Sequence, residues 1–533
     1  MSSHVYLSLV NAPIAPGRTG PKLRAIVRRS LLNLFAAGLL AAGEAAPEPK
    51  SGSQVPTKPV AAPVAPKVRK IGKVVVSGSI RTREEAWGWF TPDSGDPNYL
   101  YSGNIFRLSL SQAKENWSWQ TEFAVPFMLG LPNNATGPGT QGALGLGSNY
   151  FSANDRQRNV IGLFPKQAYI TYKSKSDTLK IGRFEFNDGS ETAPKNGTLA
   201  AVKMTRINMR LLGHFAWTHV GRSFDGMHYS HVFTDGKKNP AGNFTLVGGV
   251  PTRGVFQTDG WGWNEAAFGY GSYTKMWGKG THAADTRALA MYYTDWRDVL
   301  KTDARSLALR RGDLASPVKI GTFGGHSIHA FDTKAATYDF LFWGVGQAGK
   351  WGNLDHKAYS VDIEGGFQPK AKPLMKLRPW VRAGYSIASG DGDAADSKHG
   401  TFFQVMPTPR PFARFPFFNM MNNNDLYTGV TLRPHPKVSI SSEFHSLTLN
   451  NRNDLWYAGG GAFQPWSFGY QGRNTLGAKS LANLYDTSVD LKLNAYLSMN
   501  LYYGHAQGLS AIRGIYPKGQ SGNFGFVELM CKF

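Results

Sequence analysis

A strict two-residue alternation of apolar and polar side chains most constrains what this chain can fold into. In NIFRLSLS (104–111), Phe106, Leu108 and Leu110 fall on one side, and the polar residues between them fall on the other. The same period recurs in NWSWQTEFAV (116–125), AYSVDIEGGF (358–367), KVSISSEFHS (437–446) and SVDLKLN (488–494). A period of two predicts strands that each have one apolar face and one polar face.

The length of these segments and of their connections separates two all-β classes. The strand candidates span about 10 residues, as a tilted membrane-crossing strand requires, whereas strands in soluble sandwiches average about 5–6. Short turns such as 174–177 and 433–437 alternate with long polar loops at 127–160, 389–424 and 450–481. This layout is typical of outer-membrane barrels. The alternative is a soluble β-sandwich or propeller, whose strands also alternate.

The fold class we predict is all-β: a transmembrane antiparallel β-barrel of the outer-membrane type. At about 25 residues per strand and connection, the chain from Val74 onward gives about 18 strands (16–18) and an aqueous lumen. The closing segment places Val527, Leu529 and Cys531 outward and ends on the aromatic Phe533. We expect this strand to pair with residues 74–85 and to be read by the outer-membrane assembly machinery.

The N-terminal region predicts export from the cytoplasm. Residues 22–46 carry a basic start, an apolar stretch and small residues, so we interpret 1–46 as a cleaved signal peptide with an N-terminal extension. A retained membrane anchor is the alternative. Residues 47–73 are rich in proline and predict a disordered linker, and 74–533 form the barrel. The expected location is the cell outer membrane.

Charge and cysteine content exclude several classes of site. The formal net charge is +23, but the basic residues are spread in ones and twos along the chain, which argues against a nucleic-acid partner. The one cysteine, Cys531, allows neither an intrachain disulfide nor a cysteine-based metal site.

Five stretches, in order along the chain, resemble the alginate export family of outer-membrane porins. They are KQAYITYKSKSDTLKIGRFEF (166–186), GRSFDGMHYS (221–230), GYSIASGDGDAADSKHGTFFQVMPT (384–408), NDLYTGVTLRPHPKVSISSEFHSLTL (424–449) and DLWYAGGG (454–461). The resemblance implies an 18-stranded barrel with an electropositive constriction, long loops that limit access, and passage of an anionic polysaccharide such as alginate. The expected partners are outer-membrane lipid and an anionic polysaccharide or small anionic solute, and we expect a monomeric barrel.

Arginine is the residue type that suits a carboxylate-bearing polymer, because its fork of N–H donors matches a carboxylate. Strand phase or a family motif selects seven substrate-binding candidates: Arg81, Arg83, Arg107, Arg183, Arg378, Arg382 and Arg433. Arg183 lies in the GR motif of the family and shares a face with Leu179 and Ile181, so it needs a bulge or strand end to reach the lumen. For each arginine the alternative is a structural ion pair with an inward acid such as Glu85, Glu122, Asp362 or Glu443.

A calcium site and an enzyme are the weaker hypotheses. Asp391, Asp393 and Asp396 offer oxygen ligands for calcium, although an Asx-rich turn without an ion is the better interpretation, and no other cofactor is expected. In GHSIH (325–329), His326 and His329 must point to opposite faces of a strand. No GxSxG or HExxH motif is present, so we predict no enzyme.

Three functions therefore stay open. The first is a channel for an anionic polyuronate with lumen arginines as a charge-selective constriction. The second is a general or small-solute uptake porin on the same fold. The third is an adhesin-like surface barrel, which the aromatic stretch 412–425 keeps under consideration.

Overall fold

The protein is described from a computed structural model that covers residues 69–236 and 240–533. The predicted signal peptide and the linker as far as residue 68 lie outside the described residues.

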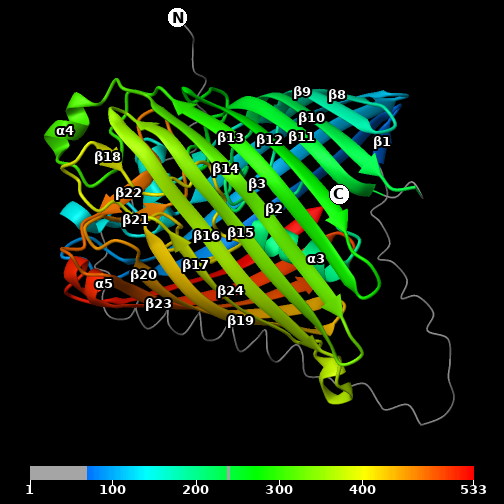
Figure 1. The fold of residues 1–533 in the computed structure, drawn as a ribbon. Coiled ribbons are helices and arrows are strands. Elements are labelled where there is room, and N and C mark those ends of the chain that lie inside the picture. Colours follow the sequence, from blue (N-terminus) through cyan, green and yellow to red (C-terminus); the bar gives the residue numbers. More distant parts are fainter. Residues whose placement is uncertain (1–68, 237–239) are drawn as a thin grey trace, which may run out of the picture. The chain divides into compact units, whose positions relative to one another are not determined.

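Eighteen antiparallel strands form a closed wall (Figure 1). They are β2 (Val74–Gly88), β3 (Asn98–Lys114), β4 (Trp117–Leu129), β8 (Phe164–Lys173), β9 (Asp177–Phe184), β10 (Phe224–Thr234), β11 (Pro240–Pro251), β12 (Ala266–Trp277), β13 (His282–Asp295), β14 (Val318–Asp332), β15 (Ala336–Trp351), β16 (Leu354–Pro369), β17 (Trp380–Ala388), β19 (Asn423–His435), β20 (Val438–Leu449), β23 (Ser480–Lys492), β24 (Leu497–Gly508) and β25 (Ser521–Lys532).

The last strand closes the barrel against the first. β25 pairs with β2 in antiparallel register from Ser79↔Lys532 to Gly88↔Asn523. Beyond the strand, Gly78 and Phe533 exchange two backbone N–H···O bonds of 3.0 Å. A short hairpin strand, β1 (Arg69–Ile71), pairs with the start of β2 and occupies the end of the predicted linker. The predicted barrel class, strand number and closing pair are therefore confirmed.

The two faces of the wall differ as the alternation predicts. On β16, Tyr359 and Ile363 are each 48% exposed, whereas Ser360 is 0% and Glu364 1% exposed. Phe533 shares the outward face with Leu529, and its ring stacks on Phe106 at 6.2 Å. The apolar face of the barrel thus points outward and the polar face points into the interior.

The connections at the two ends of the barrel differ in length. At one end, which we call the turn end, the strands join through short segments such as 115–116, 174–176, 333–335 and 436–437. At the other, the loop end, the connections include 130–163, 185–223, 389–422 and 450–479, which we call the inserted loops. Short turns face the periplasm in this class of barrel. The sequence predicted three of these loops and missed 185–223.

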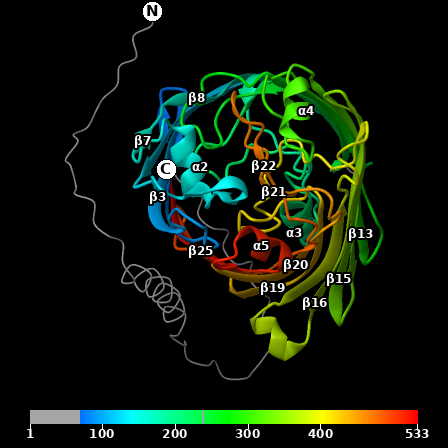
Figure 2. The same ribbon diagram turned by 90° about the vertical axis from the view of Figure 1, so that its left-hand side faces the viewer.

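The inserted loops fill the interior at the loop end (Figure 2). Their short elements are β5 (Thr136–Gly137), η1 (Gly139–Gln141), β6 (Gly142–Ala143), α2 (Leu146–Ala153), β7 (Val160–Ile161), α3 (Gly197–Val202), η2 (Lys203–Ile207), β18 (Lys398–His399), β21 (Trp456–Gly459) and β22 (Tyr470–Arg473). The other connections contain α4 (Leu307–Gly312), η3 (Lys372–Lys376) and α5 (Ser510–Ile515). No helix within 69–236 or 240–533 is long and apolar enough to cross a membrane.

The core lies inside the barrel, between the inserted loops and the wall. Phe412, Phe415, Phe417 and Phe418, from the aromatic stretch that suggested an adhesin, are all buried there. These rings pack within the barrel and leave no aromatic surface for adhesion at this segment. The interior is consequently narrowed by packed side chains, and the space between them includes cavities of about 530 and 240 Å³.

Candidate functional site: the basic lining of the barrel interior

Loop 185–223 is fixed to the wall by ion pairs. Arg206 Nε lies 2.8 Å from Glu364 Oε1, and Lys203 Nζ lies 2.8 Å from Asp285 Oδ2. Arg210 donates to the carboxylate of Asp362. The acids belong to the wall and the bases to the loop, so this loop is held at a fixed position across the interior.

A helical turn and the segment after it present these three bases to the wall. Asn196 caps α3, because its side chain accepts a hydrogen bond of 3.1 Å from the backbone N–H of Leu199. The chain then continues as η2, which contains Lys203 and Arg206, and Arg210 follows after the chain has left the helix at Asn208. Strand phase does not select these bases, but the spacing of basic residues in KMTRINMR (203–210) is a signal that could have identified them.

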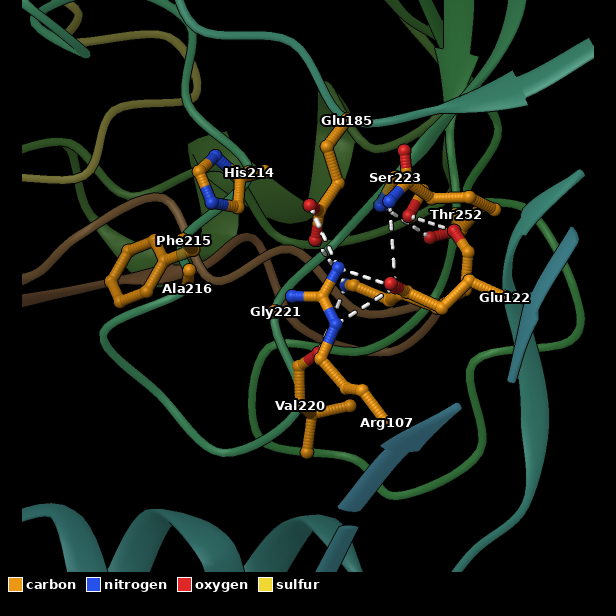
Figure 3. Close-up of polar contacts among 12 residues, drawn as sticks. Arg107, Glu122, Glu185, His214, Phe215, Ala216, Val220, Gly221, Ser223 and Thr252 are labelled. Atoms are coloured by element: carbon orange, nitrogen blue, oxygen red, sulfur yellow. Dashed lines mark hydrogen bonds and ion pairs between the residues drawn. The ribbon is translucent and has the colours of Figure 1, made fainter. Parts of the chain in front are cut away.

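One cavity opens beside Arg107 and has a volume of about 530 Å³; we call it the Arg107 cavity. Its charged lining residues are Arg69, Arg81, Arg107, Lys166, Lys532, Glu122 and Glu185. The Arg107 guanidinium lies between two carboxylates, 2.5 Å from Glu122 Oε1 and 2.9 Å from Glu185 Oε2 (Figure 3). Basic groups outnumber acids in this lining, so the cavity is electropositive.

Glu185 and His214 lie in loop 185–223 beside Arg107 (Figure 3). Burial alone would raise the pKa of Glu185, but His214, Arg107 and Lys166 outweigh burial and lower this pKa to about 2. Burial lowers the pKa of His214 to about 4, against the opposing influence of Glu185. Near neutral pH, Glu185 is therefore ionised and His214 is neutral.

A second cavity, of about 240 Å³, lies between the loops and strands β17, β19, β20 and β23; we call it the Arg433 cavity. Its charged lining residues are Arg206, Arg382, Arg410, Arg414, Arg433, Glu443, Asp486 and Asp490. Arg382 donates to Asp339 and, at 2.8 Å, to Glu364 Oε2. Arg382 is therefore already neutralised by wall carboxylates.

Arg433 differs from the other arginines of this cavity. Its guanidinium carbon lies 5.5 Å from the ring centroid of Trp380, which gives it a cation–π contact. Within the residues that the structure describes, no carboxylate oxygen lies within 4.0 Å of its nitrogen atoms. Arg433 is therefore a predicted arginine that lines a cavity without such a carboxylate partner among the described residues.

Three buried arginines are held by backbone carbonyls. Arg81 donates to the carbonyls of Ala216 and Thr218, at 2.5 Å for Ala216. Arg222 donates to Gly461 and Pro407, and Arg410 donates to Phe415 and Phe418. Burial lowers the pKa values of Arg222 and Arg410 to about 10, which leaves both charged at neutral pH. Arg81 Nε also lies 3.7 Å from Glu528 Oε2. Carbonyl oxygens carry no net charge, so Arg222 and Arg410 add positive potential to the interior.

The remaining predicted arginines lie in different surroundings. Arg83 is 2% exposed and bonds Glu528 at 2.6 Å and Glu85 at 3.3 Å. Arg378 is exposed on the turn 370–379, outside any strand. Arg183 shares its face of β9 with the exposed Ile181, as strand phase predicted, and forms a two-bond pair with Asp225 at the strand end. These three side chains do not line either cavity.

The Asp391, Asp393 and Asp396 loop forms a series of turns. Asp393 accepts from the N–H of Ala395 at 2.9 Å, and Asp396 accepts from that of Lys398 at 2.7 Å. Burial raises the pKa of Asp391 to about 6, helped by nearby Asp454. In the described part of the chain, no three His, Cys, Asp or Glu residues are grouped to hold a metal ion. Calcium binding here stays a hypothesis.

Comparisons with known proteins place this geometry in a family. The family model "Alginate export" matches residues 149–513. No curated protein matches the sequence significantly. Among solved structures, OccAB2 of Acinetobacter baumannii is similar with a TM-score of 0.52 and 9% identity, over 87% of this chain and 98% of that one. The outer membrane protein OpdK of Pseudomonas aeruginosa has a TM-score of 0.50 and 8% identity, over 86% of this chain and 98% of that one. The family match, together with the closed 18-stranded barrel, shows that this chain belongs to the alginate export family and is an outer-membrane channel protein.

Proposed function

We propose that the channel passes an anionic polysaccharide of the polyuronate class, such as alginate, along its basic interior. The observation that carries this proposal is the lining of the Arg433 cavity, where five arginines face three acids. The Arg107 cavity has the same excess of positive charge. A uronate chain carries one carboxylate per sugar, so an electropositive interior lowers the free energy of each unit that enters.

The arginines divide into two roles in this proposal. Arg206 and Arg382 are already bonded to Glu364, so they shape the wall and contribute to the field without binding the substrate directly. Arg433, which has no carboxylate partner within the described part of the chain, contacts substrate. A single charge-assisted contact at a partly open site is weak enough to release the sugar, which transport requires.

A small-solute porin is the second candidate, and the size of the cavities favours it. Sites for small ligands have volumes of about 300–1,000 Å³. The Arg107 cavity, of about 530 Å³, lies within this range, and the Arg433 cavity, of about 240 Å³, is smaller. The inserted loops bury aromatic rings in the same interior. A small carboxylate would use the same arginines without requiring a continuous path for a polymer.

Planar-bilayer recordings on the full protein distinguish these functions. Reversal potentials in a salt gradient report anion preference, and added oligouronates of increasing length report block. We expect anion selectivity and a block that strengthens with oligomer length, both weakened by Arg433→Gln. Arg452→Gln, an exposed loop arginine outside both cavities, is the matched control.

Three results separate the alternatives. Permeation by monomeric uronate without block by oligomers would favour the small-solute porin. A non-selective conductance that Arg433→Gln leaves unchanged would contradict both anion channels. No conductance at all would leave the barrel without a transport function.

A further inference from the structure

A cluster of polar side chains lies on the outward face of β13 and β14, near the turn end. Ser327 Oγ is 2.9 Å from His329 Nε2, and His329 Nδ1 is 3.1 Å from His282 Nε2. Thr286 Oγ1 is 2.9 Å from Ser327 Oγ. A hydroxyl, an imidazole that contacts it and a further group that contacts the imidazole are the parts of an activated nucleophile.

The two imidazoles are held in one plane. Their ring planes differ by 9° and their centroids are 5.4 Å apart, which together with the 3.1 Å nitrogen contact means that they meet edge to edge. Phe331 stacks on His282 at 4.7 Å, and the ring of Trp277 lies 5.6 Å from that of His329 at 84°. The imidazoles are therefore fixed by aromatic neighbours, which favours a single productive orientation.

The cluster faces lipid. On β14, Phe323 is 61% and Phe331 is 44% exposed on the same face as Ser327. His326, one residue earlier, points inward and contacts Asp285 Oδ1 at 2.8 Å. His326 and His329, whose spacing led us to predict no enzyme, do lie on opposite faces. Ser327 and His329, two residues apart, share one face.

We propose that this cluster is an esterase site that acts on the carboxylic ester of a lipid in the leaflet at the turn end. Ser327 is the nucleophile and His329 is the general base; both are catalytic residues. His282 is a positioning residue, because an N–H bond from His329 Nδ1 to His282 Nε2 leaves His329 Nε2 free to accept the Ser327 proton.

The reaction balances in two steps. The Ser327 oxygen bonds to the ester carbonyl carbon while its proton passes to His329, and the alcohol then leaves with that proton. Water attacks the acyl-serine, giving its proton to His329, and the fatty acid leaves as Ser327 regains a proton. Thr286 accepts a hydrogen bond of 3.1 Å from Trp277 Nε1, so its own hydroxyl can donate across the 2.9 Å contact to Ser327 Oγ, which leaves the Ser327 proton for His329.

A second outward hydroxyl pair in the same wall provides a control. Ser442 on β20 and Thr487 on β23 lie 2.9 Å apart, in the same cross-strand relationship as Ser327 and Thr286. Phe444 follows Ser442 on its face, in the place that His329 has beside Ser327. Such a pair is an ordinary contact between strands, so the imidazoles are what distinguish the Ser327 cluster.

Labelling of the full barrel in lipid nanodiscs with a fluorophosphonate probe tests the proposal. We expect the wild type to be labelled, and mass spectrometry to place the modification on Ser327. Ser442→Ala should retain labelling and Ser327→Ala should lose it. His329→Asn should slow labelling at least about 100-fold, the usual contribution of a general base. Fatty acid release from phospholipid vesicles should follow the same order.

His282 needs a readout of its own. His282→Gln keeps an acceptor for His329 Nδ1–H and should retain labelling, whereas His282→Phe should slow it and shift its pH profile. An unlabelled wild type, or a probe found on another residue, would overturn the proposal without depending on any variant. Bilayer conductance of Ser327→Ala should equal that of the wild type, so this result is independent of the transport proposal.

Discussion

Arg206 and Glu364 join loop 185–223 to the barrel wall, with Arg206 Nε 2.8 and 3.0 Å from the two carboxylate oxygens. The pair spans 158 residues of sequence. Glu364 also accepts from Arg382. One buried carboxylate therefore holds two arginines, one from the loop and one from the wall.

Replacing this carboxylate should release the loop. We expect Glu364→Gln to lower the free energy of unfolding by about 3–5 kcal/mol, because both arginines remain buried without the negative charge that balances them. Hydrogen exchange should become faster in 185–223, and bilayer currents should become noisier. Glu265→Gln, at an exposed position, is the control. Unchanged protection of this segment would show that the other ion pairs hold it.

Arg382 and Arg433 should differ in their structural importance. Arg382→Ala removes a cationic partner from the buried carboxylates of Asp339 and Glu364. We expect this change to lower the free energy of unfolding by about 3–5 kcal/mol. Arg433→Ala loses a partly exposed cation–π contact worth about 0.5–1 kcal/mol. Chemical unfolding in detergent measures both values. Equal costs would argue that Arg433 is also a structural residue.

Acid should loosen loop 185–223 through His219. Burial lowers the pKa of His219 to about 4, against the opposing influence of Glu85, whereas an unfolded histidine titrates near 6.5. The folded form therefore loses stability as pH falls from about 6.5 toward 4, by about 3 kcal/mol in full. Hydrogen exchange of 185–223 at pH 7.5 and 5.0 measures this loss.

His219→Gln should remove part of that pH dependence. A further part should disappear when His214, whose pKa burial also lowers to about 4, is replaced as well, while Asp188 of the same loop, whose pKa burial raises to about 6, continues to titrate in this range. Equal protection of the loop at both pH values in the wild type would contradict this account.

The seam between Gly78 and Phe533 should limit assembly. A Cβ on Gly78 would lie 2.3 Å from Phe533 Cζ and 2.6 Å from the carbonyl oxygen of Arg107, so Gly78→Ala has no room. We expect this change, and deletion of Phe533, to reduce the fraction of barrels that resist unfolding on an unheated gel. Gly346→Ala, with no atom within 4 Å of its added Cβ, should assemble normally. Normal assembly of the barrel without Phe533 would show that the contact between Gly78 and Phe533 is not required for assembly.

Calcium should leave the Asp391 loop unchanged if its turns need no ion. The expected result is the same melting temperature with calcium and with a chelator. A rise in melting temperature that Asp393→Asn removes would instead establish a site at these carboxylates.

The wall was predictable because one local rule governs it. Alternation places Tyr359 outward and Glu364 inward wherever lipid lies on one side and water on the other. The inserted loops follow no such rule. Loop 185–223 resembles a further strand or helix in sequence, and its place depends on partners as distant as Arg206 and Glu364.

The same limit applies to the arginines. Strand phase shows that Arg83 and Arg382 point inward, but not that Glu528 and Asp339 lie opposite them in space. Arg410 and Arg222 could not be selected, because their partners are backbone carbonyls, which no sequence pattern marks. The sequence therefore predicted that the lining carries positive charge, but it could not show which arginines have no structural partner and can bind a substrate.

Arg222 also restricts how such a channel can change its specificity. Its single guanidinium bonds Pro407 of one inserted loop and Gly461 of another while belonging to a third. A graft of loop 185–223 alone would leave the carbonyls of Pro407 and Gly461 without this donor, and a graft of either other loop would leave Arg222 short of one acceptor. We expect functional chimaeras only when the three loops are transferred together. The three loops should therefore change together in evolution.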